Sequence, residues 1–330
     1  MTVATRTVTE DEADIRLDRW FRRHFPGVPQ SVVQKLCRTG QVRIDGRRAD
    51  AATRLAPGQA VRIPPMSEPP PPKPQIEVDP TLARDLQKAV IYRDDQILVI
   101  NKPHGLPVQG GPGITRHLDG MLDALRFDAE HRPRLVHRLD RDTSGCLLLA
   151  RTPGVAAKLA AAFRGRDVEK TYWAVVAGRP VPVEGRIDLP LKRVGGFRGE
   201  RMQPAERDDK EGVRAVTDYR TLDHAARKLA WLELQPITGR MHQLRVHCVA
   251  IKAPILGDLK YAQPDQNNAF AATVEGLSTD LHLHARALRL PHPAGGILVV
   301  EADLPPHMEA TFRTLGFHAP PARPPRREAR

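Results

Sequence analysis

A dense run of proline divides this chain. Between Pro64 and Pro74, seven of the eleven residues are proline. Such a segment neither continues a helix nor pairs inside a sheet, and it favours an extended, semi-rigid form. We therefore expect a linker over residues 65–75, between a small domain at 14–64 and a large domain at 76–317. A second stretch rich in Pro and Arg, residues 318–330, predicts a disordered basic tail.

Positive charge is concentrated in the small domain. The chain of 330 residues carries a formal net charge of +12, and residues 16–62 hold eleven Lys and Arg against three Asp. A field of this sign favours an anionic partner, which is nucleic acid more often than an anionic membrane surface. The segment has no strong apolar helix face, which argues against membrane binding. The alternative is a charged surface that contacts only solvent. The clustering of the cations instead favours a module that binds along the phosphates of an RNA backbone.

The small domain has the pattern of two helices and a hairpin. Apolar spacing over Ile15–Phe21 predicts a first short helix, and a second is expected from an N-cap at Ser31 to a stop at Gly40. Residues 41–48 alternate like two strands joined by a turn at Asp45 and Gly46, and residues 60–63 add a strand.

This segment resembles the alpha-L RNA-binding motif, which is found in a ribosomal small-subunit protein and in several RNA-modifying enzymes. The matching residues are 16–18, Lys35, Arg38, Gly40, 42–46 and Gly58. The resemblance implies RNA binding and no chemistry. The cations expected to contact RNA are Arg16, Lys35, Arg38, Arg43 and Arg47.

The large domain has the pattern of a strand-rich α+β fold. Its strands and helices do not alternate regularly, so we expect a largely antiparallel mixed sheet. Met241, Leu244, Cys248 and Ile251 recur at spacings of 3, 4 and 3, which predicts an amphipathic helix. Further helices are expected at 155–163 and 308–315, and strands at 90–92, 97–100, 146–150, 171–176, 215–222, 229–234, 282–290 and 297–304.

Several protein classes lack their sequence signals here. No stretch approaches the roughly 18 apolar residues of a membrane span, and the N-terminus has no apolar core of a secretory signal, so we expect a cytoplasmic protein. The three cysteines form no C-x-x-C pair. Neither a phosphate-binding glycine loop nor a G-x-S-x-G elbow occurs. His282 and His284 alternate on one strand without a third ligand, so we expect no metal there.

A polar segment, residues 137–145, leads directly into the apolar strand 146–150. Asp140 stands there between arginines at the mouth of a core strand, a position suited to chemistry on an anionic substrate. An ordinary salt-bridged loop is the structural alternative. A metal-dependent hydrolase using His137, Asp140 and Asp142 is a chemical one, although the arginines are poor neighbours for a bound cation.

The segment His-Arg-Leu-Asp-Arg-Asp-Thr-Ser-Gly resembles the signature of the RluA family of pseudouridine synthases. Other stretches that resemble the family follow in its order, at 97–105, 170–172, 212–219, 239–247, 254–261 and 283–288. The resemblance implies an RNA-modifying isomerase that converts uridine to pseudouridine without metal or cofactor. With the basic module, the arrangement is most similar to the RluC-type subgroup that modifies 23S ribosomal RNA, so the expected partner is large-subunit ribosomal RNA or its precursor particle.

The same resemblance implies roles for five residues. Asp140 would be the essential carboxylate, which either attacks covalently or removes a sugar proton. Arg245 would supply the positive charge that keeps it ionised. Tyr172 would lie against the flipped uracil and assist proton removal at its carbon 5, and Leu244 would form the apolar side of the pocket. Arg138 would occupy the space that the flipped base leaves.

The remaining expectations concern supporting residues, one departure from the family pattern, the second functional reading and the oligomeric state. His137 is grouped with Arg138 and Leu244 among the residues that the resemblance places at the RNA or the flipped base. Like His242 and His247, it is expected to orient its neighbours, while residues 142–145 shape the loop. Lys252 departs from the family, which usually has glycine there, so the helix end closes differently or the lysine reaches a phosphate. A non-catalytic RNA-binding or ribosome-assembly factor on the same scaffold is the second functional reading, and a monomer is the expected state.

Overall fold

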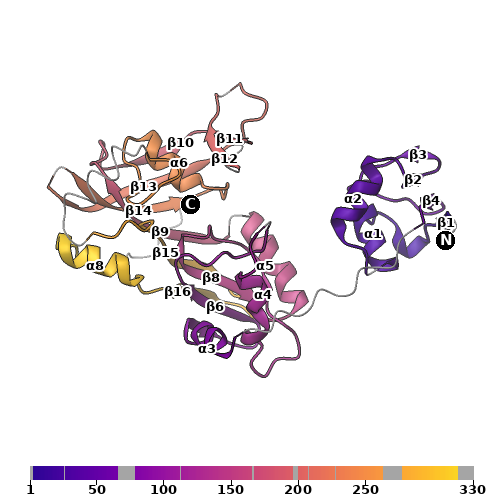
Figure 1. The fold of residues 1–330 in the computed structure, drawn as a ribbon, viewed down its shortest axis with the longest axis horizontal. Coiled ribbons are helices and arrows are strands. Elements are labelled where there is room, and N and C mark those ends of the chain that lie inside the picture. The colour runs from indigo at the N-terminus through magenta and orange to yellow at the C-terminus, as the bar shows by residue number, and fades with distance from the viewer. Residues whose placement is uncertain are drawn as a thin grey trace. The chain divides into compact units, whose positions relative to one another are not determined.

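The computed structural model describes residues 3–25, 27–65, 79–111, 113–165, 167–195, 200–206, 208–226, 228–262 and 277–318. The chain divides into two compact units, Met1–Ile76 and Glu77–Arg330 (Figure 1). Most of the proline-rich segment and the basic tail beyond residue 318 lie outside the described residues, so the expected linker and tail stay predictions.

The first unit packs two helices on a four-stranded sheet with the strand order β1-β4-β2-β3. Leu17, Trp20 and Phe21 on the first helix are fully buried and form the centre of its core. The elements are β1 (Ala4–Thr7), η1 (Glu10–Glu12), α1 (Leu17–His24), α2 (Gln30–Arg38), β2 (Arg43–Ile44), β3 (Arg47–Arg48) and β4 (Ala60–Ile63).

The expected hairpin is present, and its turn explains the sequence there. Asp45 and Gly46 have φ angles of 48° and 78°, and a two-residue type I′ turn requires positive φ at both positions. The N-cap expectation was wrong by two residues, because Pro29 caps α2 and Ser31 lies inside it. The carbonyl of Pro29 accepts the first helical hydrogen bonds, from the amides of Val32 and Val33.

The second unit is built on a ten-stranded sheet with the order β10-β13-β14-β9-β15-β8-β6-β5, with β16 on β15 and β7 on β8. All described pairs are antiparallel except β15 with β8, which confirms the expected largely antiparallel mixed sheet. Its strands are β5 (Val90–Arg93), β6 (Ile97–Lys102), β7 (Arg134–Leu135), β8 (Ser144–Ala150), β9 (Glu169–Ala177), β10 (Glu184–Asp188), β13 (Val216–Ala225), β14 (Leu229–Pro236), β15 (Leu283–Pro291) and β16 (Ile297–Glu301).

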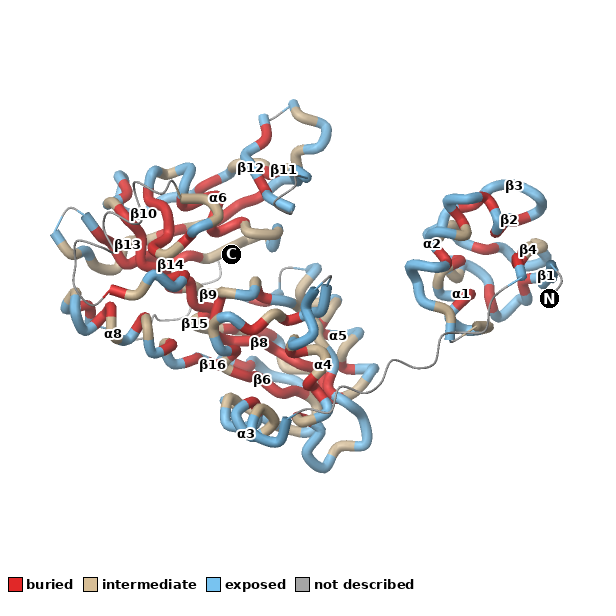
Figure 2. Tube along the Cα trace, viewed as in Figure 1, coloured by how far each residue is buried: buried red, intermediate tan, exposed pale blue. Residues whose placement is uncertain are grey.

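Helices cover both faces of this sheet, and Figure 2 shows the buried residues running along its central strands. A separate hairpin of β11 (Leu191–Val194) and β12 (Arg201–Pro204) projects beside β10 (Figure 1). Sequence patterns did not predict this hairpin, nor the strands β7 and β10, nor the helical segments at 80–88, 118–121 and 122–125. The helices are α3 (Pro80–Lys88), α4 (Leu118–Met121), η2 (Leu122–Leu125), α5 (Pro153–Gly165), α6 (Gln243–Ala250) and α8 (Pro306–Leu315).

One glycine brings the two halves of the sheet together at the site. Ser144 and Gly145, the first residues of β8, pair in parallel with His284 and Ala285 of β15. Gly145 has a φ of 108°, and a Cβ there would lie 2.3 Å from the carbonyl oxygen of Ala285. Only glycine fits this close approach. The loop that precedes β8 is thereby held beside β9, the neighbour of β15.

Candidate active site

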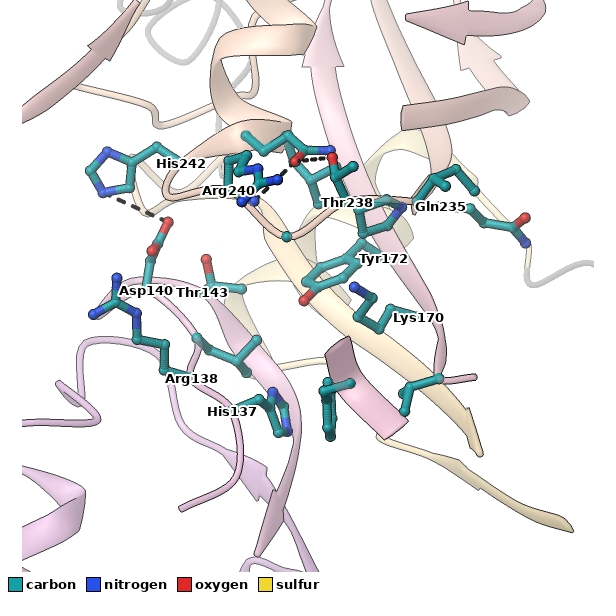
Figure 3. A pocket seen from close by; sticks show the side chains of 18 of the residues that line it. His137, Arg138, Asp140, Thr143, Lys170, Tyr172, Gln235, Thr238, Arg240 and His242 are labelled. Carbon is teal, nitrogen blue, oxygen red and sulfur yellow. Dashed lines mark hydrogen bonds and ion pairs between the residues drawn. The ribbon is translucent and has the colours of Figure 1, made fainter. Parts of the chain in front are cut away.

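A cavity of about 790 Å³ lies in the second unit, where the loop before β8 meets β9, the end of β14 and the start of α6. Five residues singled out from the sequence line it together: Arg138, Asp140, Tyr172, Leu244 and Arg245. They come from three segments that are far apart in the chain. Figure 3 shows Asp140 and His242 pointing toward each other, with Lys170 beside Tyr172.

Asp140 is positioned by a loop that is fastened to the core. The amide of Thr143 donates to the carbonyl of Asp140 at 3.2 Å. The fully buried ammonium of Lys102 donates to the carbonyl of the next residue, Arg141, at 2.9 Å, and also to the carbonyls of Pro103 and Leu106. Burial lowers the pKa of Lys102 to about 7, against the charges of Asp142 and Asp140. Sequence reasoning did not assign Lys102 this supporting role.

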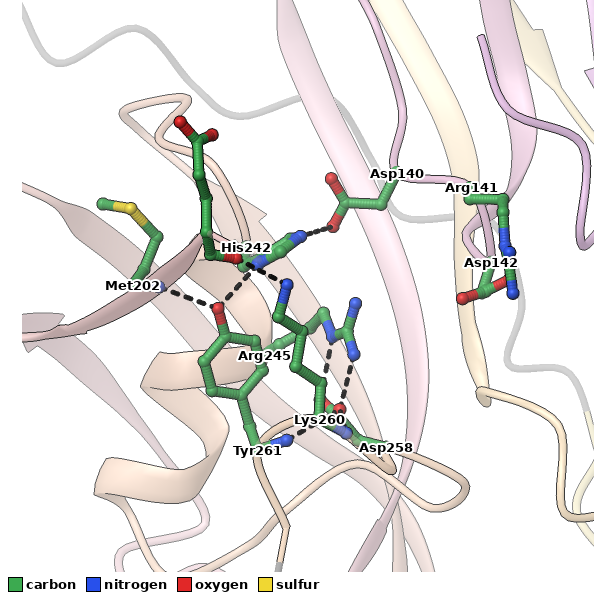
Figure 4. Close-up of polar contacts among 10 residues, drawn as sticks. Asp140, Arg141, Asp142, Met202, His242, Arg245, Asp258, Lys260 and Tyr261 are labelled. Carbon is green, nitrogen blue, oxygen red and sulfur yellow. Dashed lines mark hydrogen bonds and ion pairs between the residues drawn. The ribbon is translucent and has the colours of Figure 1, made fainter. Parts of the chain in front are cut away.

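Arg245 lies on α6, buried, and its direct partner is Asp258. Its Nε and Nη2 donate to the two carboxylate oxygens of Asp258 at 2.9 and 2.6 Å (Figure 4). Burial disfavours the charged guanidinium, but the hydrogen bonds and charge of Asp258, together with the charge of Asp140, raise the pKa of Arg245. Arg245 therefore lines the same cavity as Asp140 and interacts with its charge. Its ion pair, however, is with Asp258, which the sequence did not single out as functional.

Asp258 itself is almost fully buried and anchors the loop after α6. One of its oxygens accepts hydrogen bonds from the amides of Lys260 and Tyr261, at 3.0 and 3.1 Å. The sequence signal for this residue is an acidic side chain directly after the apolar stretch Ala253–Leu256 and Gly257. A carboxylate in that setting needs buried donors to be tolerated.

Tyr172 and Leu244 give the cavity its apolar wall. Tyr172 stands on β9, and it packs against the core clusters on both sides of the site. Burial, with the nearby negative charge of Asp140, raises the pKa of the Tyr172 phenol well above its ordinary value. The phenol therefore keeps its proton at neutral pH. Leu244, on α6, is 7% exposed and packs in the same cluster.

Arg138 and His137 differ in their surroundings although they are adjacent. Arg138 is exposed at the rim of the cavity. The Nε2 of His137 accepts a hydrogen bond from the amide of Leu148 at 2.8 Å, and its ring stacks on Phe163. Burial and the charge of Lys170 lower the pKa of His137 to about 3. A neutral ring bound to the backbone of β8 supports the loop, as expected for an orienting residue.

His247, His282 and His284 are held by hydrogen bonds within the core. His247 contacts Thr217 and the carbonyl of Leu189 through its two ring nitrogens. Both ring nitrogens of His282 and of His284 are likewise engaged. Within the described residues, no group of three side chains is placed to hold a metal ion.

The five cations of the first unit that were expected to contact RNA are exposed. Lys35 and Arg38 lie on α2, and Arg47 lies on β3. Arg43 donates to the carbonyls of Gly40 and Gly46 and so supports the hairpin. Arg16 differs from the others because it forms a close ion pair with Asp18, whose oxygen lies 2.7 Å from its Nη2. In the described part of the chain, no helix is long and apolar enough to cross a membrane.

This fold and site define a class of protein in broad terms: a mixed-sheet domain whose polar cavity is lined by a carboxylate, a guanidinium and an aromatic ring, preceded in the chain by a small basic domain. Comparison with known proteins is consistent with this class. Residues 96–250 match the family described as RNA pseudouridylate synthase, and residues 15–61 match the S4 domain.

Individual relatives support the same conclusion. "RNA pseudouridine synthase 4, mitochondrial" from Arabidopsis thaliana is 33% identical over 90% of this chain and 78% of its own length. "Ribosomal large subunit pseudouridine synthase C" from Escherichia coli K12 is 33% identical over 93% of this chain and 95% of its own. The solved structure of human RNA pseudouridylate synthase domain containing 4 covers 73% of this chain and 97% of its own, at 31% identity and a TM-score of 0.61.

The chain belongs to the RNA pseudouridine synthase family, as the sequence resemblance predicted. It is an RNA-modifying isomerase with a pseudouridine synthase fold and an N-terminal S4 domain.

Proposed function

We propose that this enzyme converts specific uridines of large-subunit ribosomal RNA, or of its precursor particle, to pseudouridine, with Asp140 as the essential carboxylate and without metal or cofactor. The proposed RNA target follows from the Escherichia coli relative, which is named as a ribosomal large subunit pseudouridine synthase. The observation that carries the catalytic proposal is the convergence of Asp140, Tyr172, Leu244 and Arg245 on one cavity. The proposed place of action is the bacterial cytoplasm, where ribosomes are assembled, although some relatives are mitochondrial.

The reaction is an isomerisation, and it balances without a co-reactant. The bond from uracil N1 to the ribose breaks, a bond from uracil C5 to the same sugar carbon forms, and the proton on C5 is replaced by one on N1. Asp140 acts on the sugar, either by covalent attack or by removing a sugar proton. Both routes need an ionised carboxylate, and the charge of Asp140 acts on the buried guanidinium of Arg245, whose pKa it helps to raise.

The apolar wall of the cavity fits a flipped base. We assign Tyr172 and Leu244 to the two sides of the uracil, where stacking on an aromatic ring offsets part of the cost of unstacking the RNA. Because the Tyr172 phenol is protonated at neutral pH, it takes up a proton from C5 only by passing its own proton on. The proposed acceptor of the phenol proton is Asp140, whose negative charge lies close enough to raise the pKa of the phenol.

The remaining assignments concern RNA binding. Arg138, at the rim, fills the space left by the flipped base. Residues 14–64 bind RNA mainly through phosphate contacts, residues 65–75 join them to the catalytic domain at 76–317, and residues 318–330 form a basic tail. All proposed catalytic residues come from one chain, so a monomer is sufficient.

The experiment is tritium release from ribosomal RNA transcribed with uridine labelled at carbon 5, in the presence of EDTA. Wild type is compared with Asp140→Asn and with Asp142→Asn, a control that removes a neighbouring carboxylate paired with the exposed Arg141. Release by wild type and Asp142→Asn, and none by Asp140→Asn at unchanged RNA affinity, supports the proposal.

Two other results point to the competing functions. Loss of release in EDTA that added metal restores favours a metal-dependent enzyme using His137, Asp140 and Asp142. If the wild type releases no tritium from naked RNA, precursor particles or transfer RNA, the chain acts as a binding or assembly factor. Substantial turnover by Asp140→Asn refutes the assigned role of this carboxylate.

A further inference from the structure

Two residues without an assigned chemical role, His242 and Tyr261, connect Asp140 to the backbone of β12. The Tyr261 hydroxyl accepts a hydrogen bond from the amide of Met202 at 2.9 Å and lies 2.6 Å from Nδ1 of His242. The Nε2 of His242 lies 3.8 Å from Oδ2 of Asp140. These contacts form a continuous chain from a strand amide to the carboxylate (Figure 4).

The direction of the protons in this chain follows from the fixed donor at its far end. A backbone amide only donates, so the Tyr261 oxygen is the acceptor of the Met202 bond. A phenol has one proton to donate, and among the described residues the acceptor within reach is Nδ1 of His242. A neutral imidazole that accepts at Nδ1 carries its proton on Nε2. That nitrogen faces Asp140.

The burial of His242 favours the neutral ring. Burial lowers the pKa of His242, and the charges of Arg245 and Lys260 lower it further against the charges of Asp140 and Asp258. The ring therefore meets Asp140 as a neutral donor at neutral pH. A neutral donor orients a carboxylate without forming an ion pair that would weaken its basicity.

The backbone at His242 is also unusual. This residue precedes α6 with a φ of 51° and a ψ of 19°, in the left-handed region that side chains other than glycine rarely adopt. Such conformations persist when the surroundings hold them, and they often occur at functional sites. Here the conformation places the ring between Tyr261 and Asp140.

We propose that His242, held by Tyr261 in the Nε2–H tautomer, is the residue that positions the carboxylate of Asp140. The N–H binds Oδ2 and leaves Oδ1 to act on the sugar. The present separation of 3.8 Å closes by about 1 Å to an ordinary hydrogen bond when the carboxylate engages the substrate. This inference rests on the proposed role of Asp140.

The tautomer is measured directly, without turnover. In protein labelled with ¹⁵N at histidine, two-bond nitrogen–proton correlations distinguish a protonated from an unprotonated ring nitrogen, and His242→Gln identifies the signals by their loss. We expect a protonated Nε2 and an unprotonated Nδ1 in the wild type, and a mixture of tautomers in Tyr261→Phe. A protonated Nδ1 in the wild type overturns the inference.

Kinetics then separate a positioning role from a merely structural one. Glutamine places an N–H close to the position of Nε2, so His242→Gln should keep turnover within about fivefold, whereas His242→Leu should lower kcat by about 100-fold. Tyr261→Phe should lower kcat by about tenfold, with KM and RNA affinity unchanged. Tyr92→Phe is the matched control, because it removes a hydroxyl on β5 that donates a hydrogen bond to Asp94.

The outcomes distinguish this inference from the proposed function. If Asp140→Asn is inactive while His242→Leu turns over as fast as the wild type, only the positioning role is wrong. The same conclusion holds if His242→Gln is as impaired as His242→Leu, because the N–H is then irrelevant. If Asp140→Asn is itself active, the proposed function fails first, and the tautomer result stands as a separate structural finding.

Discussion

Lys170 is a cation on the wall of the cavity that the described residues leave without a hydrogen bond or an ion pair. It lies beside Tyr172 (Figure 3), and burial lowers the pKa of its ammonium. A half-buried charge without a partner destabilises a folded protein. It is therefore suited to meet an anionic or carbonyl oxygen of the RNA, which would supply the missing partner.

Lys170→Met tests this with two readouts of opposite sign. Removing the unpaired charge while keeping the stem should raise the free energy of unfolding by about 1 kcal/mol. RNA affinity, measured by filter binding, should fall by about tenfold, as for the loss of one charged contact. Lys170→Arg is the control that keeps the charge. A variant that is less stable and binds equally well would contradict this role.

The ion pair of Asp258 with Arg245 is expected to matter for both stability and turnover. The Asp258 side chain is fully buried with Arg245, and removing one partner of such a pair leaves an uncompensated charge that costs about 3–5 kcal/mol. We expect Asp258→Asn to lower the free energy of unfolding by that order and kcat by about 100-fold, because Arg245 loses its fixed position. Chemical denaturation and single-turnover rates measure the two effects. A kcat within threefold of the wild type would show that the anchor is dispensable.

The candidate site shows what sequence can and cannot reveal about single residues. Asp140, Tyr172 and Arg245 belong to family-like motifs, so their identities could be named without a structure, although their convergence could not. Asp258 and Tyr261 lie in a motif that was recognised but not given a role, because their importance depends on contacts with α6 and β12. Such contacts between distant segments leave no local pattern in the chain.

At the scale of elements, the end of α6 explains the unusual lysine at position 252. The amide of Ala253 donates to the carbonyl of Cys248, and the amide of Lys252 donates to the carbonyl of Val249. Lys252 has a φ of 58° and is exposed. This is the closing turn in which a left-handed residue, usually glycine, follows the helix. The helix therefore closes in the way typical of glycine, and lysine bears the backbone strain.

Lys252→Gly should accordingly stabilise the protein. Relief of the left-handed strain is worth about 1–2 kcal/mol, and the greater freedom of glycine in the unfolded chain subtracts about 0.4–1 kcal/mol. We expect a net gain of about 0.5–1 kcal/mol, measured by denaturant unfolding. Lys252→Ala, which loses the same side chain but keeps the strain, should show no gain. Equal effects of the two substitutions would show that any change in stability comes from removing the charge of Lys252 and not from relief of backbone strain.

The elements of the fold were predictable to different degrees, for physical reasons. Long apolar strands such as β6 and β8, and the glycine-dependent hairpin at Asp45 and Gly46, have strong local signals. The exposed strand β1 has no apolar alternation to mark it, because its order depends on pairing with β4. The apolar spacing from Met241 to Ile251 predicted a longer helix than α6, which spans Gln243–Ala250. Met241 lies before the helix and packs in the cluster of Leu191 on β11 and Met202 on β12.

At the scale of the molecule, the two units differ in their buried titratable groups. In the second unit, burial lowers the pKa of His137 to about 3 and of His282 and His284 to about 4. In the first unit, burial alone would raise the pKa of Glu12. Hydrogen bonds from Trp20, from the amide of Thr9 and from His24 outweigh this effect and lower the pKa to about 2. The units should therefore respond to acid over different pH ranges.

The sign of each effect follows from proton uptake on unfolding. The histidines have an ordinary pKa of 6.5, so the unfolded form of the second unit binds more protons than the folded form once the pH falls below that value. The second unit therefore loses stability as the pH falls from about 6.5 towards 4. Glu12 has an ordinary pKa of 4.5, so its contribution to the first unit is lost between about 4.5 and 2.

Hydrogen exchange resolved by segment, at pH 7, 6 and 5, measures the two units in one sample. Once intrinsic exchange rates are corrected for pH, protection in β8 and β15 should decrease across this range while protection in α1 stays constant. His284→Gln should reduce the pH dependence of the second unit, because one proton uptake site is removed. Parallel loss of protection in both units would indicate that they do not titrate independently.

The exposed cations of the first unit should set the salt dependence of RNA binding by the full chain. Each phosphate contact releases counterions, and the slope of log affinity against log salt changes by about 0.7 per contact on a single strand. The triple substitution of Lys35, Arg38 and Arg47 by alanine should therefore flatten the slope by about 2. Arg54→Ala, which removes an exposed cation already paired with Asp14, should change it little.

Turnover separates this contribution from catalysis. Because the triple variant retains the entire catalytic unit, kcat at saturating RNA should equal that of the wild type, while KM rises and the difference grows with salt. The S4 domain would then act as an electrostatic anchor that raises the local concentration of RNA without selecting the uridine. An unchanged salt slope would assign RNA capture to the basic rim of the catalytic cavity, around Arg138, instead.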